Sequence, residues 1–258
     1  MNNVVKLVCL GAVMATSTIS ISANAGVIGV FGASTGNAVS IASAQGHTIE
    51  VISDFSNLGI YDVVWGLNGR NDAHSSQLST YSAGIESYVM HGGVLMYHDR
   101  FVTSGENFIP GASNFSFTRN TSSNIDLAQA SGVAGSSIND LTLDGGSSSN
   151  HGYVLESSID QAYTAIFDNG VDGQLVDFSY EYGLGDVYYS SIPLDYYLGG
   201  ANPVSFSTLY TPQVVDYSIS LAQANNGFSP ATVSEPESIA IFALSLLGLG
   251  ARRFKKRV

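Results

Sequence analysis

The chain has 258 residues, of which 45% are apolar and only 12% are charged, about half the charged fraction of an average soluble protein. Residues 26–230 contain three Arg, no Lys and 19 of the 21 acidic residues, which leaves this stretch with a net charge of −16. This balance argues against nucleic acid as a partner and against electrostatic docking on anionic lipid, because both need clusters of Lys and Arg.

Residues 1–25 have the parts of a secretory signal peptide. Lys6 supplies the positive start, Leu7–Ala15 is an apolar run, and the Ala-Asn-Ala of residues 23–25 fits the small-x-small cleavage rule. We therefore predict cleavage by signal peptidase after Ala25 and export of the chain. The alternative is an uncleaved N-terminal membrane anchor, which the Ser and Thr within the apolar run disfavour.

The only cysteine, Cys9, lies in this leader. A mature chain that begins at Gly26 would contain none. Disulfides, zinc–thiolate sites and a cysteine nucleophile are then excluded.

Between residues 26 and 224, short apolar runs alternate with stretches in which apolar residues recur at helical spacing. Strands are predicted at Val27–Phe31, His47–Ile52, Tyr61–Leu67 and Val94–Tyr97. Helices are predicted at Asn37–Gln45 and Ser75–His91, and glycine follows each of them, as is common at helix ends. This order predicts one α/β domain with a mostly parallel sheet and helices on both faces.

The middle of this domain, residues 101–150, is rich in Ser, Asn and Gly. It is predicted as an insertion of loops and short elements, with Ile125–Ala130 as a candidate helix and Ile138–Leu143 as a candidate strand. Strands are predicted after the insertion at Tyr163–Phe167, Leu175–Tyr180 and Asp186–Ile192. The last two are expected to pair as a hairpin, because a glycine-rich turn separates them.

One further helix closes the domain. Thr211 is predicted as its cap and Pro212 as its first helical residue. The residues expected to face the core are Val215, Ile219 and Ala222. Residues 225–234 are then predicted to form a polar linker.

Residues 235–258 have a three-part layout. Glu235-Pro236 comes first, an apolar stretch of 13 residues follows at Ile239–Ala251, and a basic cluster ends the chain. The cluster consists of Arg252, Arg253, Lys255, Lys256 and Arg257. Thirteen residues are short for a membrane span of about 20, but the basic cluster would hold that end in the cytoplasm.

This layout resembles the PEP-CTERM sorting signal of Gram-negative bacteria, which an exosortase cuts near a Val-Pro-Glu-Pro motif. The matching residues here are Val233-Ser234-Glu235-Pro236, with Ser in place of the first Pro. The resemblance implies a hydrophobic helix at 239–251, transit through the inner membrane, and delivery to the cell surface or the extracellular polymeric matrix. Signal peptidase and an exosortase-type enzyme are the implied processing partners.

The central domain resembles the class I glutamine-amidotransferase-like fold, which has a flavodoxin-like sheet. The residues that carry the resemblance are Ile28–Gly32, Tyr61–Trp65, Gly92–Asp99 and Tyr182–Tyr189. Active members of that family place a Cys nucleophile after the strand that here ends at Tyr97, whereas this chain has His98. Thiol-dependent release of ammonia from glutamine is therefore excluded. The ThuA-like branch, which is linked to sugar metabolism, has a His at a similar strand end.

His98, Asp99 and Arg100 form the densest polar cluster of the domain. They follow a predicted strand, at the edge where open α/β sheets collect their ligands. In a functional interpretation the His is a base or metal ligand and the Arg binds a carboxylate or sugar acid. In a structural interpretation Arg100 is an ion-pair partner of Asp99, Asp126 or another acid.

His151 is the second candidate. It lies near the end of the Gly- and Ser-rich run Asp144–Gly152, and it either converges with His98 or lies in a hydrophilic loop. Asp168–Gly173 departs from the EF-hand pattern at two positions, so a β-turn is predicted there instead of a calcium loop. No metal and no cofactor are predicted.

Two functions remain open. The first is a non-catalytic surface or matrix protein that binds or spaces extracellular polysaccharide. The second is a secreted enzyme that acts on a carbohydrate or small molecule with His98, Asp99, Arg100 and His151 in one pocket. The first is preferred because no complete catalytic set is present, and the second requires the two His to share a cleft.

Overall fold

A computed structural model describes residues 25–103, 108–128 and 137–225 of the chain. Ala25 is thus the first residue described, and it is exposed. The hydrophobic helix expected at 239–251, the Glu235-Pro236 pair and the basic cluster at 252–257 lie outside these residues. Within them, no helix is long and apolar enough to cross a membrane.

The fold is α/β, with one ten-stranded mixed sheet. Its parallel half consists of β1 Val27–Gly32, β2 Thr48–Val51, β3 Val63–Leu67, β4 Val94–His98 and β10 Gly185–Ser190. These strands lie in the order β2-β1-β3-β4-β10. β3 and β4 are buried along their whole length, as is typical of parallel strands that are covered on both faces.

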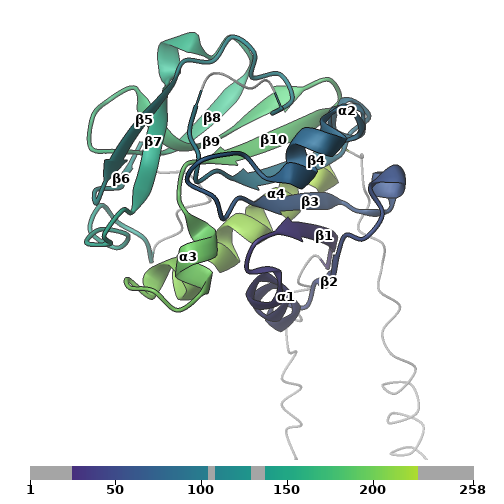
Figure 1. The fold of residues 1–258 in the computed structure, drawn as a ribbon, viewed down its shortest axis with the longest axis horizontal. Helices are drawn as coiled ribbons and strands as arrows, with labels where there is room; N and C mark the ends of the chain where they lie inside the picture. Colours follow the sequence, from purple (N-terminus) through teal and green to yellow (C-terminus); the bar gives the residue numbers. More distant parts are fainter. Residues whose placement is uncertain (1–24, 104–107, 129–136, 226–258) are drawn as a thin grey trace, which may run out of the picture.

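Antiparallel strands extend the sheet beyond β10 (Figure 1). They are β5 Phe117–Ser122, β6 Asp126–Leu127, β7 Asn150–Leu155, β8 Tyr163–Asp168 and β9 Gln174–Tyr182. β9 and β10 form the expected hairpin, in which Gly185 pairs with Tyr182. The expected parallel sheet therefore accounts for only five of the ten strands.

Helices cover both faces of the sheet, as expected. They are α1 Thr35–Ala44, α2 Ser76–Met90, α3 Leu194–Leu198 and α4 Thr211–Asn225, with 3-10 turns η1 Phe55–Ile60 and η2 Glu156–Ser158 and a π-helical turn η3 Phe206–Tyr210. α1, α3 and α4 pack with Trp65 on one face, and α2 and η1 pack with Tyr97 on the other. Buried Val215, Ile219 and Ala222 confirm the predicted inward face of α4.

Three local predictions were wrong. Asp126–Leu127, within the expected helix 125–130, is a strand that pairs with β8. The expected strand at 138–143 is a turn, in which the Asn139 side chain accepts the backbone N–H of Leu141 at 3.0 Å. Thr211 does not cap α4, because its backbone is already helical and its hydroxyl donates to the carbonyl of Phe206 in the preceding turn.

Candidate functional site

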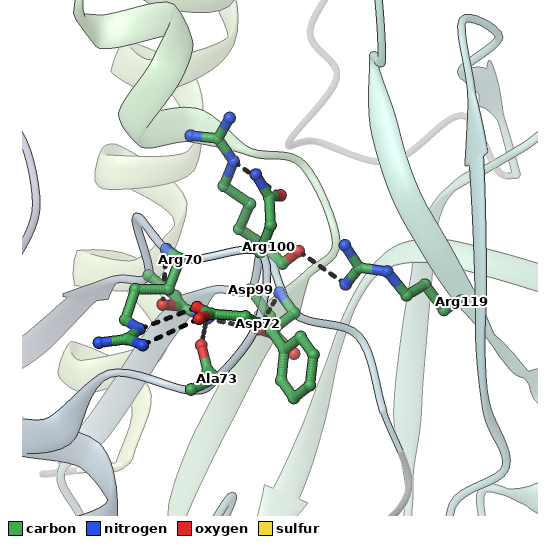
Figure 2. Close-up of polar contacts among 9 residues, drawn as sticks. Arg70, Asp72, Ala73, Asp99, Arg100 and Arg119 are labelled. Atoms are coloured by element: carbon green, nitrogen blue, oxygen red, sulfur yellow. Dashed lines mark hydrogen bonds and ion pairs between the residues drawn. The ribbon is translucent and has the colours of Figure 1, made fainter.

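The predicted polar cluster lies at the carboxyl edge of the parallel strands. His98 is the last residue of β4, and Asp99 and Arg100 follow it directly. Arg70, which follows β3, and Arg119, on β5, are the other two arginines of this edge (Figure 2). All three arginines of residues 26–230 therefore gather at one edge of the sheet.

His98 is sealed inside the protein. Its side chain is on the α4 side of the sheet, where Trp65 Nε1 donates to Nδ1 at 3.2 Å and Nε2 lies 3.1 Å from the Tyr210 hydroxyl. Because an indole N–H only donates, Nδ1 is the acceptor and Nε2 carries the proton. Burial lowers the pKa of His98 to about 3, and only 1% of the residue is exposed. The imidazole is therefore neutral and out of reach of a ligand at the surface.

Asp99 points to the opposite face. One carboxylate oxygen accepts the Phe101 backbone N–H at 2.8 Å and the Asn68 amide at 3.1 Å, and the other accepts the Tyr189 hydroxyl at 3.1 Å. His74 Nδ1 lies 3.5 Å from the first oxygen. The carboxylate is fully buried, so its role is to hold the loops after β3 and β4 together.

Arg100 makes the ion pair of the structural interpretation, with an acid that the prediction did not name. Its Nη1 donates to Asp195 Oδ2 at 2.9 Å and its Nε to Asn71 Oδ1 at 3.2 Å. The guanidinium lies 5.6 Å from the ring centre of Tyr196, whose residue is 43% exposed. Burial raises the pKa of Asp195, and the charge of Arg100 opposes that rise.

The second oxygen of Asp195 is also notable. Oδ1 is buried and has no hydrogen-bond partner among the described residues. Asp195 lies on α3, directly before exposed Tyr196. A buried carboxylate oxygen without a donor is costly, and it lies here on the residue before an exposed aromatic ring.

His151 lies on β7 and not in a hydrophilic loop. Its Nδ1 is 2.9 Å from the backbone carbonyl of Arg100, and the same carbonyl accepts Arg119 Nη1 at 3.2 Å. Burial, more than any other factor, lowers the pKa of His151. His151 therefore meets Arg100 and Arg119, while the His98 ring lies among Trp65 and Tyr210 in the interior.

A buried polar network continues from His98. Tyr210, which contacts His98, donates to Asp177 Oδ2 at 2.7 Å, and Tyr188 donates to the same oxygen at 2.6 Å. Asp177 is fully buried, and burial raises its pKa to about 7. The network ties β9, β10 and η3 to β4 and gives the sealed His98 a structural role.

No group of three His, Cys, Asp or Glu side chains suited to a metal ion occurs in the described parts of the chain. The Asp168–Gly173 segment connects β8 to β9, and Asp168 Oδ1 accepts the Gly170 N–H at 2.8 Å as in a tight turn. Sequence reasoning named Tyr196 among the tyrosines able to stack on a sugar ring, but it missed Asp195 and Arg119. The signal for Asp195 was the scarcity of cations, since a half-buried Arg100 needs a nearby acid.

Comparisons with known proteins give structural likeness only. No family model and no curated protein matches the chain. Cytoplasmic Protein STM3548 from Salmonella typhimurium has a TM-score of 0.52 and 11% identity over 76% of this chain and 98% of its own. That likeness concerns the fold alone.

Two further solved structures are more distant. A β-galactosidase from Rahnella sp. R3 has a TM-score of 0.46 and 14% identity over 76% of this chain and 31% of its own. The mmIFT52 N-terminal domain has a TM-score of 0.46 and 10% identity over 79% of this chain and 98% of its own. Neither supports an inference about function.

Proposed function

We propose that this chain is an exported protein of the bacterial cell surface or extracellular polymeric matrix. Its α/β domain would associate with extracellular polysaccharide without catalysing a reaction. The leader at 1–25, the Glu235-Pro236 pair, the apolar stretch 239–251 and the basic end support the route, through signal peptidase and an exosortase-type enzyme. The −16 charge of the central stretch is consistent with a protein that avoids nucleic acid and anionic lipid.

The flavodoxin-like, amidotransferase-like character of the fold is part of this proposal. The parallel strands lie in the order β2-β1-β3-β4-β10, which corresponds to the flavodoxin-like order 2-1-3-4-5 when β10 is counted fifth. The strand that carries the nucleophile in that family corresponds to β4, which ends here at His98.

The observation that carries the non-catalytic assignment is the sealing of His98. A general base must reach the proton that it abstracts, and both nitrogens of His98 are engaged by interior side chains. The enzymatic alternative depended on His98 and His151 in one cleft. The enzymatic alternative therefore loses its principal residue, and His151 is also buried, which leaves Arg100 as the accessible binding group.

The best-equipped polysaccharide contact is the edge formed by Arg100, Asp195 and Tyr196. An exposed tyrosine ring stacks on a sugar ring through its apolar face. The Arg100 guanidinium offers donors for hydroxyl groups, and its ion pair with Asp195 holds it near the ring. Because the two charges balance each other, this edge suits a neutral sugar.

The polysaccharide assignment is tested with Tyr196→Ala. Retention of the purified protein on the exopolysaccharide of its producing cells should fall several-fold, while the unfolding midpoint stays near wild type. Tyr163→Ala is the matched control, since Tyr163 is 38% exposed but lies on β8. Equal retention of the Tyr196 variant and the wild type would contradict the assignment.

Sorting is tested with a peptide epitope added after Val258. In a host with an exosortase, the surface form should lack the epitope. Replacement of Glu235 and Pro236 by Ala should keep the epitope-bearing chain in the inner membrane. Cytoplasmic retention of the wild-type chain would contradict the proposal.

A further inference from the structure

A groove of the described molecule lies at the opposite edge from Arg100. It has a volume of about 560 Å³ and runs between η1 and α2. Tyr61 and Asp62, just before β3, line it together with Gly92 and Gly93, just before β4. The groove is therefore at the amino edge of the parallel strands, and its size is within the range of small-molecule sites.

Two glycines of this groove have no structural reason to be glycine. Gly84 is inside α2, where a Cβ atom would approach only the carbonyl oxygen of Phe55, at 3.8 Å. Gly59 has nothing within 4 Å of a Cβ position, and its φ is not in the left-handed region. A helix-interior glycine is less stable than alanine. At both Gly59 and Gly84, the missing side chain leaves the groove between η1 and α2 unfilled.

Other glycines of the same groove do have such reasons. Gly92 has a φ of 105°, which favours glycine at a helix end. A Cβ on Gly93 would clash with the Tyr88 ring. At Gly59 and Gly84, by contrast, neither backbone conformation nor packing requires glycine, and the effect of the missing side chain is to keep space open.

The groove combines aromatic rings with negative charge. Phe55, Tyr61 and Tyr88 line it, as do Asp62 and His91. Tyr61 donates to Glu50 at 2.6 Å, and burial together with the nearby charges of Glu50 and Asp54 raises its pKa to about 12.

His91 is the one basic side chain that lines the groove, and arginine is absent from this end of the described structure. All three of its arginines gather around the opposite edge, where Arg119 reaches the Arg100 backbone (Figure 2). Asp62 uses Oδ2 to accept the Val27 N–H at 2.7 Å, and this hydrogen bond is exposed to solvent. Carboxylates beside aromatic rings are the chemistry that recognises an organic ammonium ion.

We propose that the groove between η1 and α2 binds an organic ammonium group, supplied by a free polyamine or by an amino sugar. Asp62 neutralises its charge, the aromatic rings contact its methylene or ring carbons, and Gly59 and Gly84 allow close approach. The proposal does not depend on export or on the Tyr196 edge, so the tests of the two proposals fail separately.

The test is calorimetric titration of the purified full chain in non-ionic detergent. The probes are spermidine, a glucosamine oligomer and the N-acetylated form of that oligomer, which has lost the ammonium charge. At least one amine should bind and the acetylated oligomer should not. Binding of spermidine alone identifies a free amine as the ligand source, and binding of the glucosamine oligomer alone identifies an amino sugar.

Three variants tie the binding to the groove. Asp62→Asn keeps an oxygen acceptor for Val27 and should weaken binding at least about tenfold, which corresponds to about 1.4 kcal/mol. Gly84→Ala should weaken binding while its melting temperature equals or exceeds that of wild type. Gly36→Ala is the matched control, because a Cβ at this position of α1 would meet nothing within 4 Å. It should leave binding unchanged.

The proposal is overturned if neither amine binds. It is also overturned if the amines bind the Asp62 and Gly84 variants as tightly as wild type, or if the acetylated oligomer binds equally well.

Discussion

The ionisation of Asp177 is set by its burial in the polar network behind His98. Oδ2 accepts two tyrosine hydroxyls, whereas Oδ1 has no partner within the described ranges. The folded pKa of about 7 lies above the ordinary value of 3.8. Folding therefore takes up a proton between these two values, and the free energy of unfolding falls as the pH rises from about 4 to about 7.

We expect Asp177→Asn to remove this part of the pH dependence. The variant cannot ionise at this position, so its unfolding free energy should change less than that of wild type across this window. Urea unfolding at several pH values between about 4 and about 8 measures the difference. Parallel curves for the two proteins would show that Asp177 does not titrate in this range.

Arg100 and Arg70 provide a second comparison of single residues. Arg100→Ala would leave the buried carboxylate of Asp195 without its cation, at a cost of about 1–3 kcal/mol. Arg70 instead pairs with Asp72 at 3.1 Å, and both side chains are well exposed. Arg70→Ala should therefore change stability little. Chemical unfolding of both variants tests this order, and equal effects would contradict it.

At the scale of elements, β3 shows how closely the two layers approach the sheet. Gly66 lies between the rings of Phe31 and Tyr97, and an added Cβ would come within 2.6 Å of both. Both rings are buried, so neither can move away freely.

Gly66→Ala should thus destabilise the protein by about 1–3 kcal/mol through overpacking. Gly36→Ala, on α1, should be neutral or stabilising because its position is open. The midpoints of thermal unfolding distinguish the two variants. A Gly66 variant as stable as wild type would mean that the Phe31 and Tyr97 rings leave room for a methyl group at this position.

The strands β5 and β7 show where element prediction failed. Most β5 side chains are exposed or half-buried, so the strand lacks the alternation of apolar and polar residues that identifies a half-buried strand. β7 contains Asn150, His151 and Gly152, which are typical of loops. Backbone pairing with β9 and β5, and not side-chain preference, makes β7 a strand.

At the scale of the whole molecule, both ends of the described chain leave from the same edge. Val27, near the first described residue, donates to Asp62 at the start of β3. Asn225, the last described residue, donates to Asp186 near the start of β10 at 2.8 Å. The Arg100–Asp195–Tyr196 edge is at the other end of these strands, so a domain attached through its C-terminal tail would present that edge outward.

The lack of cysteine after residue 25 makes this orientation measurable. Tyr196→Cys and Leu184→Cys place a thiol at the carboxyl and the amino edge, respectively, and both residues are exposed. On intact cells that retain the tail, a large membrane-impermeant maleimide should label position 196 faster than position 184. The purified variants serve as the control for intrinsic reactivity. If positions 196 and 184 are labelled at equal rates both on cells and in the purified protein, the proposed attachment is contradicted.

Composition and local order determined the outline of this protein. The chain order of apolar runs and helical spacings predicted the α/β class, the parallel strands β1 to β4, the β9–β10 hairpin and the inward face of α4. These features follow from short-range periodicity, which burial on one or both faces imposes directly on the residues. The charge count also indicated that an arginine such as Arg100 would either bind a ligand or form an ion pair with a nearby acid.

Only the tertiary structure decided which side chains meet. His98 and Asp99 are neighbours in sequence, yet they point to opposite faces because successive residues of an extended chain alternate. Arg100 pairs with Asp195, which is 95 residues away in the sequence. The groove between η1 and α2 likewise forms between two separate connections of the chain, and no sequence motif links them. Such contacts depend on strand order and long-range packing, which local residue patterns do not encode.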